Sequence, residues 1–445
     1  MDPRDIMSET AMSPRQIIVV AVTVALCALD GFDVLAISFA SPGISSEWGI
    51  DRAALGIVLS MELLGMAIGS VVMGRFADAL GRRPVILACV ILMSVGMWMA
   101  TTVTGIVDLS IWRIATGMGI GGTLSAINAV AAEFSNARRR SLCVSMMVIG
   151  YPIGAVIGGT IAAMLLRNND WRSVFEFGAT ATAALIPVVF IFVPESVAWL
   201  CEKQPKNALD KVNRVLVRMG KNAVSKLPPP AAAQQRQSLA TIFSRDLAPT
   251  TIFATLAYAL HITTFYYILK WVPKIVVDMG FEAASAAGVL VWANLGGATG
   301  GALFGLLAQR IDLFRLTIGT LLLATTMVIL FGTGFDDLYR LSLISAAVGF
   351  FTNSGVVGIY AILAQVYTAG TRATGTGFAI GMGRGGSVVA PILAGFLFAA
   401  GYGLQTVSVV MGLGSTIAAF AIWLLLRSQS MNREHSHKAS KNGIV

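Results

Sequence analysis

Residues 74–83 read Gly-Arg-Phe-Ala-Asp-Ala-Leu-Gly-Arg-Arg and lie at the junction of two apolar stretches, 54–76 and 84–104. An apolar stretch of about 20 residues can cross a bilayer as a helix, so the charged segment is expected to be a short loop at the membrane surface. Gly74 would let two helices approach closely, and Gly81 would permit the turn. Asp78 can pair with arginines or with a neighbouring helix terminus. We predict an ionic latch between helices that separate and rejoin; the alternative is a merely basic surface loop.

Apolar stretches of this length recur along the whole chain. Of the 445 residues, 56% are hydrophobic and only 12% are charged, whereas soluble domains contain about 25% charged residues. This composition excludes a water-soluble enzyme. It predicts an all-α membrane protein with twelve transmembrane helices, near 17–40, 54–76, 84–104, 109–133, 141–166, 172–193, 249–272, 284–308, 315–333, 338–366, 373–398 and 402–427.

The polar segments divide the spans into two groups of six. We predict an N-terminal tail (1–16), a six-helix bundle (17–194), a linker (195–248), a second six-helix bundle (249–427) and a C-terminal tail (428–445). Lys and Arg concentrate in the tails, the linker and the loops on the same side of the membrane. Both termini are therefore expected to be cytoplasmic, with the protein in the inner membrane. This topology explains the net charge of +9 without nucleic-acid binding.

The two halves also repeat. Shifts of 231 or 232 residues place Gly74 on Gly305 and Arg140 on Arg372. A parallel duplication of six spans predicts a substrate site near the membrane midplane between the halves. The four cysteines lie far apart and form no CxxC pair, so neither a disulfide framework nor a zinc site is suggested. We expect no cofactor, with protons as the coupling ion.

Two acids interrupt the first span, at Asp30 and Asp33. Residues three apart share a helix face, and charge inside a membrane is costly and usually functional. Two neighbouring carboxylates repel each other when both are ionised, which suits proton carriage. Alternatively, one of them caps the helix or pairs permanently with an arginine.

The fourth span carries Arg113 and ends at Glu133. A buried arginine needs an anionic partner, which could be Asp30, Asp33 or the substrate. Glu133 could couple protons, or could equally form a surface ion pair with the arginines at 138–140. Glu62, in the second span, has no assigned partner, and its role stays open.

The second half carries Arg384 within Gly381-Met-Gly-Arg-Gly-Gly-Ser387. A guanidinium among glycines has room for two parallel hydrogen bonds to a carboxylate. Aromatic residues such as Phe32, Tyr266 and Tyr267 are candidates to flank a substrate ring. Lys270 is expected to extend to the periplasmic edge.

These motifs carry a resemblance to known transporters. The 74–83 segment resembles the loop signature of the major facilitator superfamily, and so the predicted architecture is the major facilitator fold. Together with Asp-Gly-Phe-Asp (30–33), Gly-Tyr-Pro-Ile-Gly (150–154), Pro-Glu-Ser (194–196) and the Arg384 segment, it is similar to the aromatic acid/proton symporter family. The resemblance implies import of a benzoate-like or hydroxybenzoate-like acid with protons, and importance for Asp30, Asp33, Gly74, Asp78, Gly81, Arg113, Glu133, Arg372 and Arg384.

We therefore predict a monomeric secondary transporter, not an enzyme, that imports a small aromatic carboxylate by proton symport and alternating access. Asp30, Asp33 and Glu133 would couple protons. Arg113 or Arg384 would bind the carboxylate, and the 74–83 loop and Arg372 would gate. The alternatives are a proton-coupled exporter, a symporter of another organic anion, and a transport-dead sensor of aromatic acids.

Overall fold

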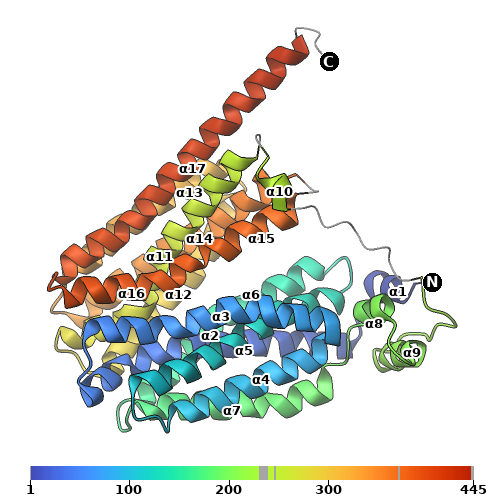
Figure 1. Ribbon diagram of the computed structural model, residues 1–445, viewed down its shortest axis with the longest axis horizontal. Helices are drawn as coiled ribbons and strands as arrows, with labels where there is room; N and C mark the ends of the chain where they lie inside the picture. Colours follow the sequence, from blue (N-terminus) through green and yellow to red (C-terminus); the bar gives the residue numbers. More distant parts are fainter. Residues whose placement is uncertain (1, 230–238, 245–246, 369–370, 442–445) are drawn as a thin grey trace. The chain divides into compact units, whose positions relative to one another are not determined.

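The computed structural model describes residues 2–229, 239–244, 247–368 and 371–441, which are helical wherever they are regular (Figure 1). Twelve helices among these residues are long and apolar enough to cross a membrane, and the predicted fold class is confirmed. The first six are α2 (Pro14–Trp48), α3 (Arg52–Leu80), α4 (Arg82–Ala100), α5 (Ile106–Glu133), α6 (Arg140–Leu165) and α7 (Arg172–Phe192). The chain is thus a multi-pass membrane protein.

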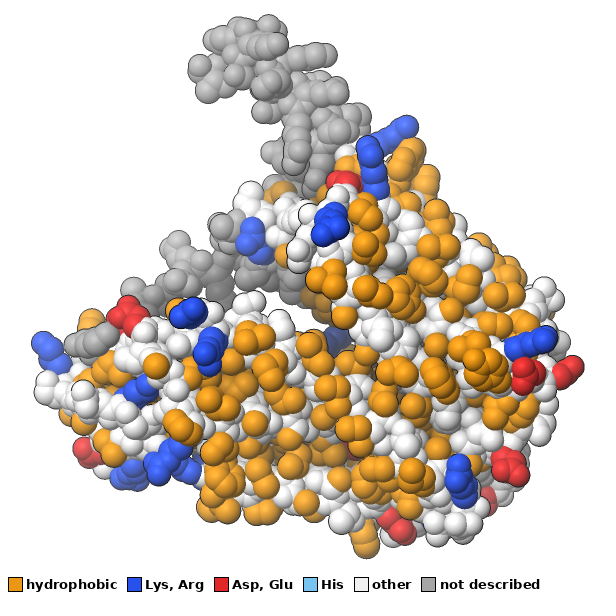
Figure 2. Space-filling model, turned by 180° about the vertical axis from the view of Figure 1, so that it is seen from behind, with side chains coloured by type: hydrophobic (Ala, Val, Ile, Leu, Met, Phe, Trp, Pro, Cys, Tyr) orange, Lys and Arg blue, Asp and Glu red, His pale blue; other side chains and the backbone are white. Residues whose placement is uncertain are grey.

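The second six spans follow a polar segment. They comprise α11 (Ala248–Asp278), α12 (Ala283–Leu307), α13 (Leu313–Gly332), α14 (Leu338–Val366), the pair α15 (Arg372–Gly383) and α16 (Gly385–Ala399), and α17 (Leu404–Lys441). The membrane-spanning part of α17 ends at Ser428, although the helix itself continues into the predicted C-terminal tail. Residues 442–445 of that tail lie outside the described residues. Hydrophobic side chains cover much of the surface of the spans, as lipid contact requires (Figure 2).

Local sequence explains where several spans begin and end. Ser13 and Gln16 form a reciprocal capping box at the start of α2, and Pro14 occupies the first turn, where its missing N–H costs nothing. Gly81 has φ +111°, a conformation that favours glycine, so the turn expected at this residue is confirmed.

The chain divides into two compact units. Unit 1 comprises Met1–Ile50 and Met61–Gln234, and unit 2 comprises Asp51–Ser60 and Gln235–Val445. The first residues of α3 therefore group with the second half of the sequence. Within unit 2, Arg52 forms an ion pair with Asp278 at 3.0 Å, and its guanidinium lies over the Phe398 ring.

The described residues of the predicted linker form three short helices, α8 (Val197–Lys203), α9 (Ala208–Arg218) and α10 (Leu239–Ile242). The apolar face of α9, with Val212, Val215 and Leu216, packs into the core of unit 1. Pro230 and most of the Gln/Ala-rich stretch of the linker lie outside the described residues.

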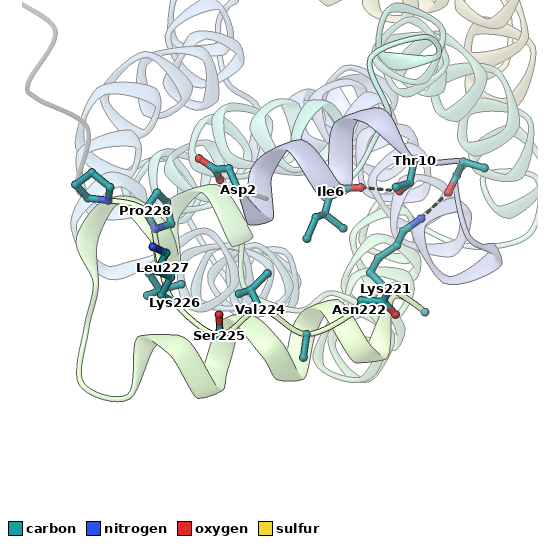
Figure 3. Close-up of a pocket in the computed structure, with 14 residues that line it drawn as sticks. Asp2, Ile6, Thr10, Lys221, Asn222, Val224, Ser225, Lys226, Leu227 and Pro228 are labelled. Atoms are coloured by element: carbon teal, nitrogen blue, oxygen red, sulfur yellow. Dashed lines mark hydrogen bonds between the residues drawn. The ribbon is translucent and has the colours of Figure 1, made fainter.

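The short N-terminal helix α1 (Pro3–Glu9) lies beside α8 and α9 at one end of unit 1 (Figure 1). Between α1 and residues 220–229 is an open pocket of about 930 Å³, across which Lys221 Nζ donates a hydrogen bond to the Ala11 carbonyl (Figure 3). Burial lowers the pKa of Lys221, whereas the Arg4 guanidinium lowers the pKa of Asp2. These contacts tie the N-terminal tail to the linker.

Candidate functional site

Asp30 and Asp33 lie inside unit 1, and neither is exposed. Among the described residues, neither carboxyl oxygen of Asp30 has a hydrogen-bond partner. Asp33 Oδ2 accepts a hydrogen bond of 3.5 Å from Thr182 on α7. A buried carboxylate without a hydrogen-bond donor or a neighbouring cation is costly as an anion. The free energy of the Asp30 carboxyl group therefore depends strongly on whether it holds a proton.

A buried ion pair lies beside these acids. Arg113 on α5 pairs with Glu62 on α3, and both side chains are fully buried. Arg113 also donates to the Asp33 carbonyl at 3.0 Å, and its guanidinium lies 5.3 Å from the centre of the Phe175 ring. The partner of Arg113 is thus Glu62 and not the carboxyl group of Asp30 or Asp33. A side chain at Gly117 would collide with the Glu62 carbonyl, so this glycine brings α5 close enough to α3 for the pair to form.

Breaking this pair should destabilise the protein. The Glu62→Gln variant leaves the Arg113 charge buried, which should lower the free energy of unfolding by about 3 kcal/mol. Thermal unfolding in detergent measures the loss. The matched control is the double variant Glu62→Leu/Arg113→Met, which removes both charges and should melt above the single variant. Equal melting temperatures for wild type and Glu62→Gln would contradict a structural ion pair.

Phe32 was expected near a substrate ring, but it is only 2% exposed. Its ring packs edge-on against Phe177 at 5.2 Å and fills the space left by Gly158 on α6. In this arrangement Phe32 is part of the packing of unit 1, because α2 presents it to α6 and α7.

The 74–83 segment forms a network with the residues that follow α7. Arg82 pairs with Asp78 at 2.9 Å, as expected from the sequence. Oε1 of Glu195 accepts from the backbone amides of Arg82 (2.8 Å) and Ser196 (2.9 Å), and the Trp199 indole donates to the Asp78 carbonyl (3.0 Å). Sequence reasoning noted the Pro-Glu-Ser motif but gave Glu195 no role. The structure makes it the acceptor at the start of α4.

Other residues of the predicted gate have different surroundings. Arg83 donates to the Phe190 carbonyl at 2.7 Å, and Arg372 is exposed at the start of α15. A side chain at Gly74 would meet no other described atom within 4 Å, so the close helix contact expected there is not found in the described residues. Glu133 approaches Arg82 at 3.8 Å and thereby joins the Asp78 network; no ion pair with residues 138–140 was found for it among the described residues.

A second polar cluster lies in unit 2, around Arg384. This residue stands at the break between α15 and α16, and Gly386 allows α16 to approach the Ala259 carbonyl of α11. The Arg384 guanidinium lies close enough to the hydroxyls of Tyr258, Tyr360 and Tyr266 to interact with them electrostatically. Tyr258 and Tyr360 share a hydrogen bond of 3.0 Å between their hydroxyls. The broken helix therefore places a cation next to three phenol groups.

The residues of this cluster differ in how far their side chains are exposed. Tyr258 is 2% exposed, whereas Tyr360 is 39% exposed and Arg384 and Tyr266 are half-buried. An arginine in a membrane span normally faces protein or a water-filled cavity rather than lipid. If Tyr258 accepts from Arg384 and donates to Tyr360, the Tyr360 hydroxyl can donate to a ligand. Sequence reasoning missed Tyr258 and Tyr360, which no motif marks.

Tyr267 and Lys270, which were singled out in the sequence, are buried in unit 2, and so is His261. Tyr267 is fully buried and its hydroxyl bonds Ser408 Oγ at 2.8 Å, so its ring packs between α11 and α17 and not beside Arg384. His261 bonds Ser415 through Nδ1 and the Thr352 carbonyl through Nε2, each at 2.8 Å. Lys270 is also fully buried, so the expectation that it extends to the periplasmic edge is wrong. Among the described residues, no group of three His, Cys, Asp or Glu side chains is arranged to hold a metal ion.

Comparison with known proteins gives one family for this chain. The Major Facilitator Superfamily profile matches residues 22–348. The chain is 27% identical to the gallate transporter of Pseudomonas putida, over 95% of this chain and 94% of the relative. It is also 27% identical to the 3-(3-hydroxy-phenyl)propionate transporter of Escherichia coli K12, over 95% and 96%.

The fold is shared with a solved transporter structure. A bacterial homologue of the human lysosomal transporter Spinster, in an inward-facing and unoccupied conformation, superposes with a TM-score of 0.74 at 15% identity, covering 94% of this chain and 98% of that one. Twelve spans, the ionic network at residues 74–83 and the matching profile agree with one another. The chain therefore belongs to the Major Facilitator Superfamily and is a membrane transporter, not an enzyme.

Proposed function

We propose that this protein imports a small aromatic carboxylate together with protons across the inner membrane, as a monomer with both termini in the cytoplasm. The observation that carries the proposal is the Arg384 guanidinium among the Tyr258, Tyr266 and Tyr360 hydroxyls inside the membrane-spanning part of unit 2. Such a group suits a ligand that has both an anionic and an aromatic part. Two relatives are named as transporters of gallate and 3-(3-hydroxyphenyl)propionate, which are both hydroxylated aromatic acids.

In this proposal Arg384 holds the substrate carboxylate. A guanidinium offers two parallel donors. Gly385, next to Arg384, has open space beside it, whereas Gly383 and Gly386 pack closely against Tyr258 and Ala259. Tyr360 and Tyr266 would contact the ring or its hydroxyl groups. Arg113 is the weaker candidate, because Glu62 and the Asp33 carbonyl already engage its guanidinium.

Asp30 and Asp33 would carry the coupling proton. Asp30 is the stronger candidate because it is buried without a hydrogen-bond partner among the described residues, whereas Thr182 donates to Asp33. An anion that enters a cell works against the interior-negative potential, at about 2.3 kcal/mol per charge per 100 mV. One proton per monoanion would remove this cost.

The Asp78 network would act as the gate. The Asp78→Asn variant keeps the size of the side chain but removes its charge. It should slow substrate exchange about fivefold, the effect of losing an ion pair worth about 1 kcal/mol. Equilibrium binding should stay near the wild-type value, because Asp78 belongs to an exposed network at a helix end and not to the Arg384 cluster. Binding and exchange measured in the same proteoliposomes separate the two effects, and a loss of binding would contradict a purely gating role.

Uptake into proteoliposomes tests the function directly. Labelled 3-hydroxybenzoate should accumulate inside vesicles that are alkaline relative to the medium, and a protonophore should abolish the accumulation. Competition by benzoates, phenylpropionates and aliphatic diacids would define the substrate class. Strong competition by the diacids alone would favour another organic anion. Accumulation driven only by the opposite gradient in oriented vesicles would indicate an exporter, and binding without any flux would indicate a sensor.

A further inference from the structure

A groove in unit 1 combines basic and apolar side chains at the edge of the membrane-spanning region. It has a volume of about 470 Å³ and lies where α4 begins and α7 ends, with α8 and α9 along its other side. Its basic side chains are Arg83, Lys211, Arg214 and Arg218, and Glu195 is its single acidic residue. Basic side chains gather at the end of unit 1 that α8 and α9 occupy (Figure 2).

The acidic residue does not neutralise the groove. Oε1 of Glu195 accepts from the backbone amides of Arg82 and Ser196, and is thereby committed to the start of α4. Arg83 and Arg218 donate to the carbonyls of Phe190 and Ile191, which holds their guanidinium groups at the end of α7. Nε of Arg83 is buried without a hydrogen-bond partner among the described residues. Lys211 and Arg214 are exposed on the polar face of α9. The groove therefore keeps an excess of positive charge and unused donors.

The other wall of the groove is apolar and belongs to the spans. Leu80 is 61% exposed and Phe190 is 60% exposed, and Leu87 lines the same groove one turn into α4. These three residues belong to membrane-spanning helices, which acyl chains surround. A ligand that fills the groove would thus meet fixed cations at one end and hydrocarbon at the other.

We propose that this groove binds an anionic phospholipid such as phosphatidylglycerol. The phosphodiester would accept hydrogen bonds from Arg83, Lys211 and Arg214, and the acyl chains would run along Leu87 and Phe190. Basic pockets at the cytoplasmic ends of membrane helices recognise anionic headgroups in this way. A soluble phosphate would leave the apolar wall uncovered, and a zwitterionic lipid would bring an ammonium group against the arginines.

Lipid binding to the full-length protein tests the proposal. Native mass spectrometry in nonionic detergent would count phosphatidylglycerol or phosphatidylcholine molecules bound to each variant. The Lys211→Ala/Arg214→Ala variant should bind phosphatidylglycerol about thirtyfold more weakly than wild type. Alanine preserves the helix, so α9 should still fold. The matched control is Lys203→Ala/Lys206→Ala, which removes the same charge from exposed residues of the same linker outside the groove, and it should bind as wild type does.

Four results would overturn the proposal. The groove variant could retain its affinity for phosphatidylglycerol, or the control variant could lose as much, which would indicate diffuse attraction to a basic surface. Phosphatidylcholine could bind as tightly as phosphatidylglycerol. Finally, inorganic phosphate could bind with the same dependence on Lys211 and Arg214 while phosphatidylglycerol does not compete, which would identify a soluble phosphate as the ligand.

Discussion

Replacement of Asp30 by Asn should abolish the concentration of substrate against a gradient. Asparagine has nearly the same volume as aspartate but cannot take up and release a proton. If one proton accompanies each substrate anion, the transported pair is neutral, and a difference of about one pH unit supports about tenfold accumulation of the anion. The variant should reach only equal concentrations on both sides. The measurement is steady-state accumulation in proteoliposomes with an imposed pH difference.

Two comparisons make this result specific. Counterflow exchange, which needs no net proton movement, should survive in Asp30→Asn if the variant is folded and binds substrate. The control variant Asp108→Asn removes an exposed acid from the first turn of α5 and should accumulate substrate as wild type does. Asp33→Asn should reduce accumulation as well, since Asp33 shares a helix face with Asp30 and is the second candidate to carry the proton. Its carboxyl group accepts a hydrogen bond from Thr182. Full accumulation by both Asp30→Asn and Asp33→Asn would show that other groups carry the proton.

The second large effect is expected at Arg384. The Arg384→Lys variant keeps the charge but loses the two parallel donors, and a lost hydrogen bond to a charged group is worth about 1.5–3 kcal/mol. The affinity for an aromatic carboxylate should therefore fall about 10- to 100-fold. Binding of a hydroxybenzoate to purified protein in detergent isolates this step from proton coupling.

The neighbouring tyrosines and the uncharged ligand provide the controls. The corresponding amide, which lacks the anion, should bind wild type and Arg384→Lys about equally. Tyr360→Phe should weaken binding less than Arg384→Lys, because it removes one neutral donor and leaves the ring. Tyr267→Phe should leave affinity unchanged, since the Tyr267 hydroxyl is bonded to Ser408 inside the packing of α11 and α17. Equal affinity of the acid for wild type and Arg384→Lys would make Arg384 a packing residue and Arg113 the next candidate.

Part of the candidate site could be read from the sequence because its signals are local. The spacing of Asp30 and Asp33 places them on one helix face, and a charged residue in an apolar stretch is conspicuous wherever the helix packs. The same holds for Arg113 and Arg384. The pairing of Asp78 with an arginine could also be anticipated, because Arg82 and Arg83 follow it directly after the turn at Gly81.

The residues that contact these side chains could not be predicted from the sequence in the same way. Glu62 was noticeable as an acid in an apolar stretch, but nothing in the sequence connected it with Arg113. Tyr258 stands in an apolar stretch with no motif around it, and its place beside Arg384 is seen only in the structure. Phe32 and Tyr267 looked suited to a substrate ring because they are aromatic and near a charged residue. In the structure, the orientation of each helix about its axis places both rings in the interior packing of their units.

The order of amino acids along the chain was enough to predict twelve membrane spans, which the described residues contain, and the 74–83 segment indicated the superfamily. Each span must satisfy its own backbone hydrogen bonds and present about 20 apolar residues to the bilayer, and both requirements are met within one continuous segment. Which polar groups meet depends instead on how the helices pack: Arg113 pairs with Glu62, Arg384 lies beside Tyr258, and Glu195 accepts from the start of α4. These pairs join different helices, and their formation depends on close packing at residues such as Gly117, which hydropathy along the chain does not encode.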